Sequence, residues 1–190
     1  NSIIQINQIE TQEARAFLKR REELQIEAQQ KAEKIVADAQ KEAERMAKSE
    51  VVQAQGVKAL DFALLDNHNK LIRLEDLRGQ YVVLDFWGAW CKWCIKGIPM
   101  MKEYYEKYKG KFEILSIDNK DDRDTWLEAL EEYQMPWLHV YNPDNSSLCD
   151  DYAIAGYPTK IIIDPEGYIV KTIIGEDPEF YELLDELFQE

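Results

Sequence analysis

Two of the three cysteines, Cys91 and Cys94, are separated only by Lys92 and Trp93. A three-residue step on a helix places both sulfurs on one face, where they are close enough to form a disulfide. The pair follows an almost continuous apolar run, residues 81–87, and opens a helical pattern. This spacing indicates reversible dithiol and disulfide chemistry at a strand-to-helix turn.

The expected position of Cys91, at the start of a helix, would make it the more reactive thiol. Unpaired backbone N–H groups and the positive end of the helix dipole stabilise a thiolate there, and Lys92 adds a positive charge nearby. We therefore expect Cys91 to be the nucleophile. Cys94, one turn further into the helix and more enclosed, would close the disulfide or release a bound substrate.

The same cysteine spacing also serves zinc, which usually takes four ligands. The chain offers no second pair, because Cys149, His68 and His139 stand singly. We therefore expect no metal and no cofactor. Cys149 is interpreted as a small buried core residue rather than a third redox thiol.

Composition excludes several classes of partner. Asp and Glu outnumber Lys and Arg by 37 to 23, which gives 190 residues a formal charge of −14. Such a surface repels nucleic-acid phosphates and anionic lipid heads. No apolar run approaches the roughly 18 residues that a membrane-spanning helix needs.

The chain divides into a helical extension, residues 1–55, and an α/β domain, residues 56–190. Residues 10–48 contain no Gly or Pro and are rich in helix formers, which predicts one long helix. Its apolar stripe is thin and mostly alanine, so it is either a solvated spacer or a surface that packs on a second copy or a partner. Four isoleucines ahead of it, in residues 3–9, nearly alternate and indicate either a strand tail or a capping segment.

From residue 56 onward, short apolar runs separated by turn residues alternate with helical patterns, which is typical of an α/β fold. The expected strands are residues 60–65 and 71–74 as a hairpin, 81–87 as a central strand, and 112–117, 137–141, 161–163 and 168–174. Helices are expected over residues 96–108 and 122–133, and after Asp177-Pro178 at the end of the chain.

Residues 85–94 (DFWGAWCKWC) resemble the active-site segment of thioredoxins, and Pro99 and residues 152–159 (YAIAGYPT) extend the match. The resemblance covers residues 57–190, and the hairpin and the extra helical stretch at 121–134 are more similar to the TlpA/ResA branch. It implies a thioredoxin fold, a central mixed sheet flanked by helices with an N-terminal hairpin extension and an inserted helix. It also implies an extracytoplasmic thiol-disulfide oxidoreductase that reduces protein disulfides and depends on an upstream redox partner.

Carried over to this sequence, the resemblance implies roles for further residues. Asp85 would be a buried carboxylate that helps move the proton of Cys94. Pro158 would follow a cis peptide bond, and Tyr157 would offer backbone hydrogen bonds to an extended substrate. Trp90 and Trp93 would form the rim of the site, where they would contact substrate or shield the disulfide.

Two positions depart from these families. Lys92 and Trp93 stand where thioredoxins have Gly-Pro, and Gly97 stands where ResA-type proteins carry an acidic residue near the second cysteine. Both changes remove features that raise or buffer thiol pKa values. We therefore expect a disulfide more easily reduced than that of thioredoxin.

Two other functions compete with the oxidoreductase. In the first, the long helix recruits a partner and the cysteine pair is a redox sensor in a binding or assembly module. In the second, weaker, the fold reduces peroxides. Peroxidatic sites need a differently placed cysteine in a loop rich in Thr and Pro, which the region of Cys91 and Cys94 does not supply.

Overall fold

The computed structural model describes residues 2–53, 56–144 and 146–189, with described side chains at 15–41, 43, 56–144 and 146–189. It divides into two compact units, residues 1–44 and 45–190. The domain boundary proposed from the sequence, between residues 55 and 56, stays a prediction.

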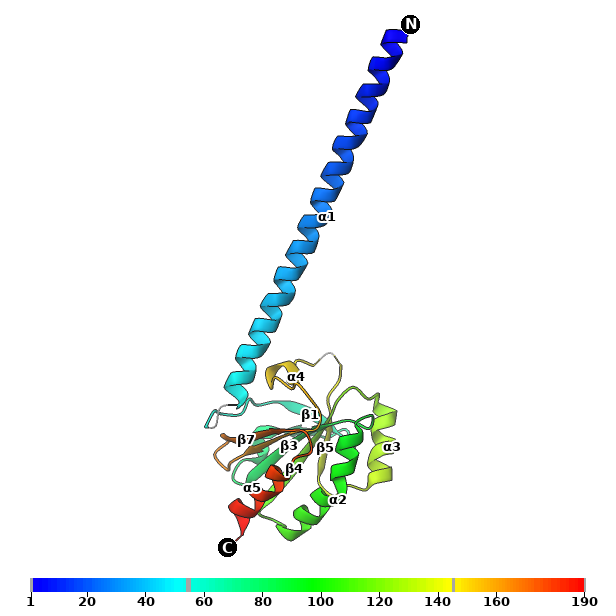
Figure 1. Cartoon of the computed structure of the whole chain (residues 1–190). Helices are drawn as coiled ribbons and strands as arrows, with labels where there is room; N and C mark the ends of the chain where they lie inside the picture. The colour runs from blue at the N-terminus through cyan, green and yellow to red at the C-terminus, as the bar shows by residue number, and fades with distance from the viewer. Residues whose placement is uncertain (1, 54–55, 145, 190) are drawn as a thin grey trace. The chain divides into compact units, whose positions relative to one another are not determined.

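The N-terminal region is one helix, α1 (Ser2–Gln53), longer at both ends than predicted. The isoleucines of residues 3–9 lie within it, so neither a strand nor a separate capping segment forms there. Without Gly or Pro, nothing interrupts its backbone hydrogen bonds, and Figure 1 draws it unbroken. Lys31 pairs with Glu27 at 2.7 Å, as the spacing predicts.

The remaining chain forms a seven-stranded mixed sheet in the order β2-β1-β5-β4-β3-β6-β7. Its two central pairs, β3 with β4 and β4 with β5, are parallel, whereas the outer pairs are antiparallel. The strands are β1 (Ala63–Asp66), β2 (Leu71–Arg73), β3 (Tyr81–Trp87), β4 (Phe112–Asp118), β5 (Leu138–Tyr141), β6 (Thr159–Ile163) and β7 (Ile169–Ile174).

The helices begin where side-chain caps and proline allow. They are η1 (Leu74–Leu77, a 3-10 helix), α2 (Lys92–Lys107), α3 (Arg123–Tyr133), α4 (Leu148–Asp151) and α5 (Pro178–Phe188). Asp122 caps α3 by accepting a 2.9 Å hydrogen bond from the Thr125 N–H. Asp177 and Pro178 start α5 as predicted. Helix α2 begins four residues before the predicted residue 96, because Cys91 caps it.

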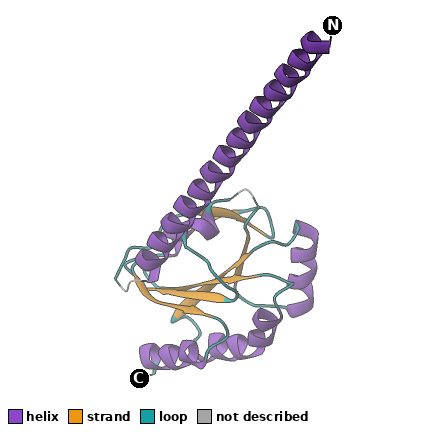
Figure 2. Cartoon of the chain, turned by 45° about the horizontal axis from the view of Figure 1, so that its top comes forward, coloured by secondary structure: helices purple, strands orange, loops and turns teal. Residues whose placement is uncertain are grey.

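Strand β3 separates two apolar cores. Val83 and Trp87 pack with residues of α2, α3 and α5, whereas Leu84 and Phe86 pack with residues around α4 on the other face. Figures 1 and 2 show α2, α3 and α5 around the sheet. Because side chains alternate along a strand, Asp85 points to the face that carries α2. This alternation directs one carboxylate of the central strand toward the cysteine-bearing helix.

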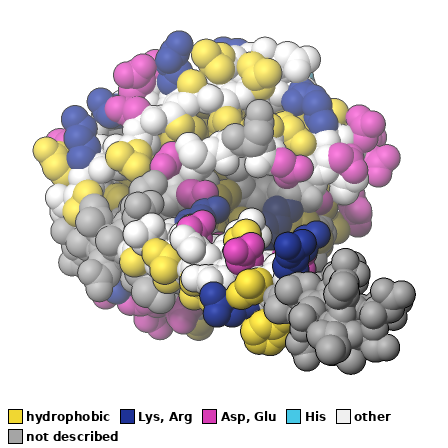
Figure 3. All heavy atoms as spheres, turned by 90° about the horizontal axis from the view of Figure 1, so that it is seen from above, with side chains coloured by type: hydrophobic (Ala, Val, Ile, Leu, Met, Phe, Trp, Pro, Cys, Tyr) yellow, Lys and Arg dark blue, Asp and Glu magenta, His cyan; other side chains and the backbone are white. Residues whose placement is uncertain are grey.

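The fold thus confirms the predicted thioredoxin-type architecture with an N-terminal hairpin, an inserted helix α3 and a long preceding helix. In the described part of the chain, no helix is both long and apolar enough to cross a membrane. The surface seen in Figure 3 intersperses basic, acidic and hydrophobic side chains.

Candidate active site

Cys91 and Cys94 form a disulfide at the start of α2, with their Cα atoms 5.2 Å apart. Cys91 is the N-cap residue of the helix, and its Sγ accepts a 3.2 Å hydrogen bond from the Cys94 N–H. A side-chain acceptor at this position satisfies one of the unpaired N–H groups of the first turn. The structure therefore places the predicted pair at the helix N-terminus, where a negative charge on Cys91 is favoured.

The expected difference in enclosure between the two cysteines is absent from this oxidised state. Each cysteine is 5% exposed, so Cys91 is as buried as Cys94. The physical reason is that bonded sulfurs cover one another and pack in the core with Trp87 and Ile98. Reduction breaks the bond between the two sulfurs, so the exposure of the Cys91 sulfur to a substrate has to be considered for the reduced protein.

A tight loop between β3 and α2 sets the position of the disulfide. A side chain at Gly88 would come within 2.8 Å of the Asn119 carbonyl oxygen and would also collide with the Trp90 indole. Glycine leaves room for the Trp90 indole N–H to donate to the Asn119 carbonyl at 2.9 Å. The Ala89 N–H donates to Asp121 Oδ2 at 2.6 Å. These contacts tie the loop that carries Cys91 to the end of β4.

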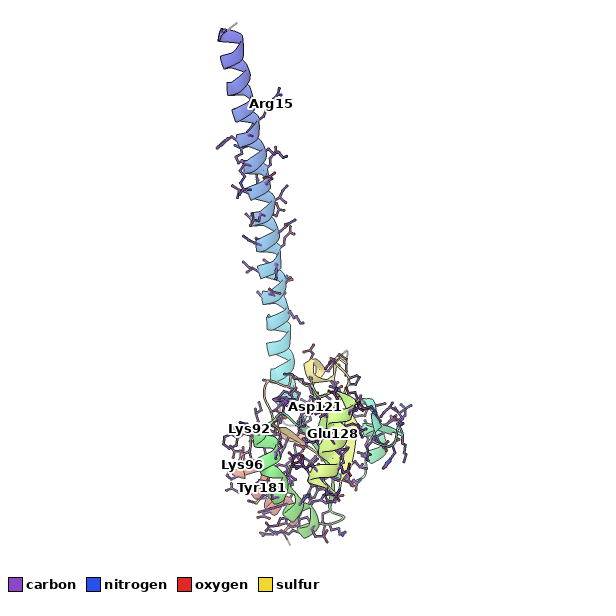
Figure 4. The ribbon with its side chains drawn as sticks, turned by 90° about the vertical axis from the view of Figure 1, so that its right-hand side faces the viewer. Arg15, Lys92, Lys96, Asp121, Glu128 and Tyr181 are labelled. Carbon is purple, nitrogen blue, oxygen red and sulfur yellow. A yellow bond between two sulfur atoms is a disulfide. The ribbon has the colours of Figure 1, made fainter. Side chains whose placement is uncertain are left out.

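A tryptophan precedes each cysteine of the pair, and both are exposed, Trp90 by 47% and Trp93 by 61%. Lys120 Nζ lies 5.5 Å from the Trp90 ring centre, and Lys96 Nζ lies 4.8 Å from that of Trp93. Lys96 is one helical turn after Lys92, and the two lie along α2 in Figure 4. Large exposed aromatic rings with adjacent cations are typical of contact surfaces rather than of a packed core.

The segment containing Pro158 also adjoins this rim. The Tyr157–Pro158 peptide bond is cis, and Pro158 is buried immediately before β6. The Tyr157 ring meets Trp90 edge-to-face, with 5.1 Å between ring centres. Burial raises the pKa of the Tyr157 hydroxyl. Trp90 and Tyr157, which are 67 positions apart in the chain, are therefore adjacent at one surface.

Asp85 is buried, 5% exposed, on the face of β3 that carries α2. Its Oδ2 accepts a 2.9 Å hydrogen bond from the Ser116 hydroxyl, which in turn accepts one from the Trp137 indole N–H at 2.8 Å. Burial raises the pKa of Asp85, while the charge of Lys160 and the Ser116 hydrogen bond oppose this and Glu176 adds to it. A carboxyl group with a raised pKa is suited to accept a proton near neutral pH.

Lys160 and Glu176 also belong to this buried charge cluster, and neither was predicted from the sequence. Lys160 is 1% exposed, and its Nζ lies 2.9 Å from Glu176 Oε2. The signal for Lys160 was its place as the one charged residue of a short strand rich in isoleucine, Thr159–Ile163. For Glu176 the sequence held no comparable signal, because its contact depends on how the turn between β7 and α5 folds.

Gly97 was expected to leave the region near Cys94 without an acidic group, but the structure differs. The space above its Cα is filled by the Glu176 carboxylate, whose Cδ would lie 2.5 Å from a Cβ at position 97. A carboxylate is therefore present beside this turn of α2, although residue 97 does not supply it. The expectation of an easily reduced disulfide loses this support and rests on Lys92, Trp93 and the helix N-terminus.

Cys149, expected in the core, is only half-buried. Its Sγ lies 2.8 Å from Asn119 Oδ1 and 3.7 Å from the Tyr157 hydroxyl. Burial raises the pKa of this thiol. It packs against the apolar cluster around α4, as expected, while its sulfur contacts polar groups behind the rim.

Asp118, at the end of β4, should make the protein less stable as the pH rises. Burial and the neighbouring Asp121 raise the pKa of this carboxyl from 3.8 to about 9. A raised folded-state pKa gives stability that is complete below pH 4 and is lost as the pH rises toward 9. We expect Asp118→Asn to increase the free energy of unfolding by more than about 1 kcal/mol at pH 8, and by much less at pH 4. Urea titrations at the two pH values measure this, and an equal change at both would contradict it.

A helix-capping disulfide beside a buried carboxylate, on a mixed sheet of this order, defines a thioredoxin-like thiol-disulfide oxidoreductase. Comparison with known proteins agrees: the model of the AhpC/TSA family matches residues 55–172. The chain belongs to this AhpC/TSA family. Its fold and its enzyme class are those that the sequence predicted.

Individual proteins similar to this chain are named as thiol-disulfide oxidoreductases or thiol:disulfide interchange proteins. The thiol-disulfide oxidoreductase ResA of Bacillus cereus (strain ZK / E33L) is 36% identical over 122 residues, 64% of this chain and 70% of the relative. The thioredoxin domain of a thiol-disulfide oxidoreductase from Bacteroides vulgatus superposes with a TM-score of 0.66 at 30% identity, covering 72% of this chain and 99% of that domain. A thiol:disulfide interchange protein from Bacteroides sp. gives 0.66 at 28%, covering 73% and 93%. The family match, residues 55–172, begins after α1.

Proposed function

We propose that the protein reduces disulfides of protein substrates through the Cys91 and Cys94 pair. The Cys91 thiolate attacks a substrate disulfide, forms a mixed disulfide and expels one substrate thiol. Cys94 then loses its proton, attacks the Cys91 sulfur and releases the second substrate thiol. Two electrons pass to the substrate and the enzyme becomes oxidised. The observation that carries this proposal is the disulfide at the N-terminus of α2, the product of that cycle.

The rim around the disulfide is the proposed substrate-binding surface. Trp90 and Trp93 supply exposed aromatic area, and Tyr157 packs against Trp90. Pro158 ends the segment before β6, so the backbone at Tyr157 can pair with an extended substrate chain. In this role Trp90 and Trp93 contact substrate, and the same rings shield the disulfide between cycles.

The reduction potential tests the direction of the reaction. Stabilisation of the Cys91 thiolate favours the dithiol form, which raises the potential. We expect a value above that of thioredoxin, about −270 mV, and well below that of the oxidant DsbA, about −120 mV. Equilibration with glutathione buffers, read by alkylation and mass spectrometry, gives the value. A potential near −120 mV would indicate an oxidase, and one at or below −270 mV would contradict the stabilised thiolate.

The proposed site of action is outside the cytoplasm, with re-reduction by an upstream thiol partner. Likeness to ResA-type oxidoreductases supports this location. Fractionation of cells that make the protein, followed by detection with an antibody, tests it. Recovery with cytosolic markers would contradict the location and leave the chemistry of the cysteine pair unaffected.

Helix α1 favours an additional partner contact. Its described part exposes large apolar side chains, including Phe17, Ile26 and Ile35, each by more than half. Solvent exposure of such groups is unfavourable, and a second copy or a partner protein would cover them. Sedimentation velocity of the full chain at increasing concentration distinguishes self-association from a monomer. In the alternative function, a redox-sensing or assembly module, α1 would need to make this contact. The contact would then form even in a variant that cannot reduce disulfides.

A further inference from the structure

The Glu176 carboxylate occupies the place of a missing side chain on α2. Glu176 lies in the turn between β7 and α5, far from α2 in sequence. Its Cδ and Oε1 would lie 2.5 and 2.7 Å from a Cβ at Gly97. Gly97 is three residues after Cys94, so the two positions are neighbours on one face of the helix. A carboxylate is thus held beside the turn of α2 that carries Cys94.

This carboxylate is fixed by two hydrogen bonds. Lys160 Nζ donates to Glu176 Oε2 at 2.9 Å, and the Tyr181 hydroxyl donates to Oε1 at 2.7 Å. The Lys160 side chain is 2% exposed, and a buried ammonium group requires a partner of opposite charge. The Glu176 side chain is 17% exposed, so it is the member of the pair that reaches solvent.

The pair is connected to Asp85 through the sheet. Lys160 is the register partner of Asp85 in the antiparallel pairing of β3 with β6. The alternation of both strands places the two side chains on the face that also carries Cys94 and Ile98 of α2. Asp85 therefore shares the charge of Lys160 with Glu176. One buried ammonium beside two carboxyl groups leaves an excess negative charge, which one additional proton neutralises.

We propose that Glu176, acting through Lys160, is a positioning residue that keeps Asp85 able to accept the proton of Cys94. In the release step the Cys94 S–H proton moves to an Asp85 oxygen, and the thiolate attacks the Cys91 sulfur. The bond from Cys91 to the substrate sulfur breaks, and the departing sulfur takes a proton from solvent. By engaging Lys160, Glu176 prevents that positive charge from acting on Asp85 alone and making it a poor proton acceptor.

This inference rests on the proposed function, and a two-phase reaction separates the two. Reduced protein in a Cys149→Ala background is mixed with the aromatic disulfide 5,5′-dithiobis(2-nitrobenzoate). Attack by Cys91 releases one coloured thiol, and attack by Cys94 releases a second. The amplitude and rate of the first phase test the nucleophile. The pH dependence of the second phase tests Glu176.

The two members of the pair should shift that pH dependence in opposite directions. Glu176→Gln removes a negative charge near Asp85, so its proton affinity falls. The midpoint of the second phase that is set by Asp85 ionisation should therefore move to lower pH. Because Asp85 is then a weaker base, the phase should also slow about tenfold near pH 7, until Cys94 ionises unaided at alkaline pH. Lys160→Met removes the opposing positive charge, so the midpoint of the second phase should move to higher pH. Glu179→Gln, a carboxylate in the first turn of α5 that pairs with Lys171 instead, should leave the profile unchanged.

Moving the carboxylate from position 176 to position 97 distinguishes the effect of its charge from a structural effect of the Glu176 side chain. Gly97→Asp combined with Glu176→Ala places a carboxylate from α2 in the vacated space, because aspartate carries its carboxyl carbon one bond beyond Cβ. The pH profile should return toward that of the unmodified protein, and Gly97→Ala with Glu176→Ala should not restore it. Shifts of the same sign in Glu176→Gln and Lys160→Met, or a relocated variant with the profile of Glu176→Gln, would overturn the proposal. Loss of the first phase in the unmodified protein would instead overturn the proposed nucleophile.

Discussion

Cys91→Ser is expected to lose disulfide reduction by about three orders of magnitude or more, because neither Cys94 nor Cys149 occupies the N-cap position of α2. Cys94→Ser should behave differently. Its Cys91 still attacks, but the resolving sulfur is missing, so the mixed disulfide with the substrate accumulates. A fluorophore-quencher peptide disulfide measures turnover, and non-reducing mass spectrometry detects the covalent complex.

Cys149→Ser is the matched control for both variants, since it also removes one thiol. The half-buried Cys149 side chain is hydrogen-bonded to Asn119 and has no assigned part in disulfide exchange. Turnover should therefore stay within about twofold of the unmodified protein. Trapping of substrate through Cys149, or comparable turnover in Cys91→Ser, would refute the assignment of Cys91. The same Cys94→Ser complex, isolated from a cell extract, identifies the substrates.

The second large effect is expected from Asp85→Asn, which removes the buried proton acceptor. Release of substrate from the mixed disulfide should slow by about a hundredfold near pH 7, the lower range for loss of a general base. The difference should shrink at alkaline pH, where Cys94 loses its proton to solvent. The second phase of the aromatic disulfide reaction, followed from pH 5 to 10, measures this. An unchanged profile would leave Asp85 as a hydrogen-bonded core carboxyl group.

The same substitution should also stabilise the fold in a pH-dependent manner. Burial raises the pKa of Asp85 in the folded state above 3.8, so its contribution to stability is complete below that pH and is lost as the pH rises. Asparagine does not ionise, and Lys160 keeps Glu176 as its partner at 2.9 Å. We expect a gain of about 1 kcal/mol at pH 8 and none at pH 3.5, measured by urea unfolding. A loss of stability at pH 8 would show that Lys160 needs both carboxylates.

Local patterns in the sequence were sufficient to predict most of the elements that hold the site. The apolar run at residues 81–87 is β3 with the predicted bounds, because a central strand covered on both faces is largely apolar, with Asp85 as its one charged residue. The helical range expected from residue 122 and the pair Asp177-Pro178 marked the starts of α3 and α5, because helix caps act within one turn. The cysteine spacing likewise determined the disulfide, since its geometry depends on one turn of α2.

Tertiary structure decided which charges surround that disulfide. Asp85, Lys160 and Glu176 are separated by 75 and 16 positions in the chain, and they meet only through the register of β3 with β6 and the fold of the turn before α5. The glycine at position 97 led us to expect no acidic group beside the second cysteine, but the Glu176 carboxylate fills the space that this glycine leaves. A sequence specifies the charge and local direction of each side chain, whereas burial and pairing, which set proton affinity, depend on contacts between distant segments.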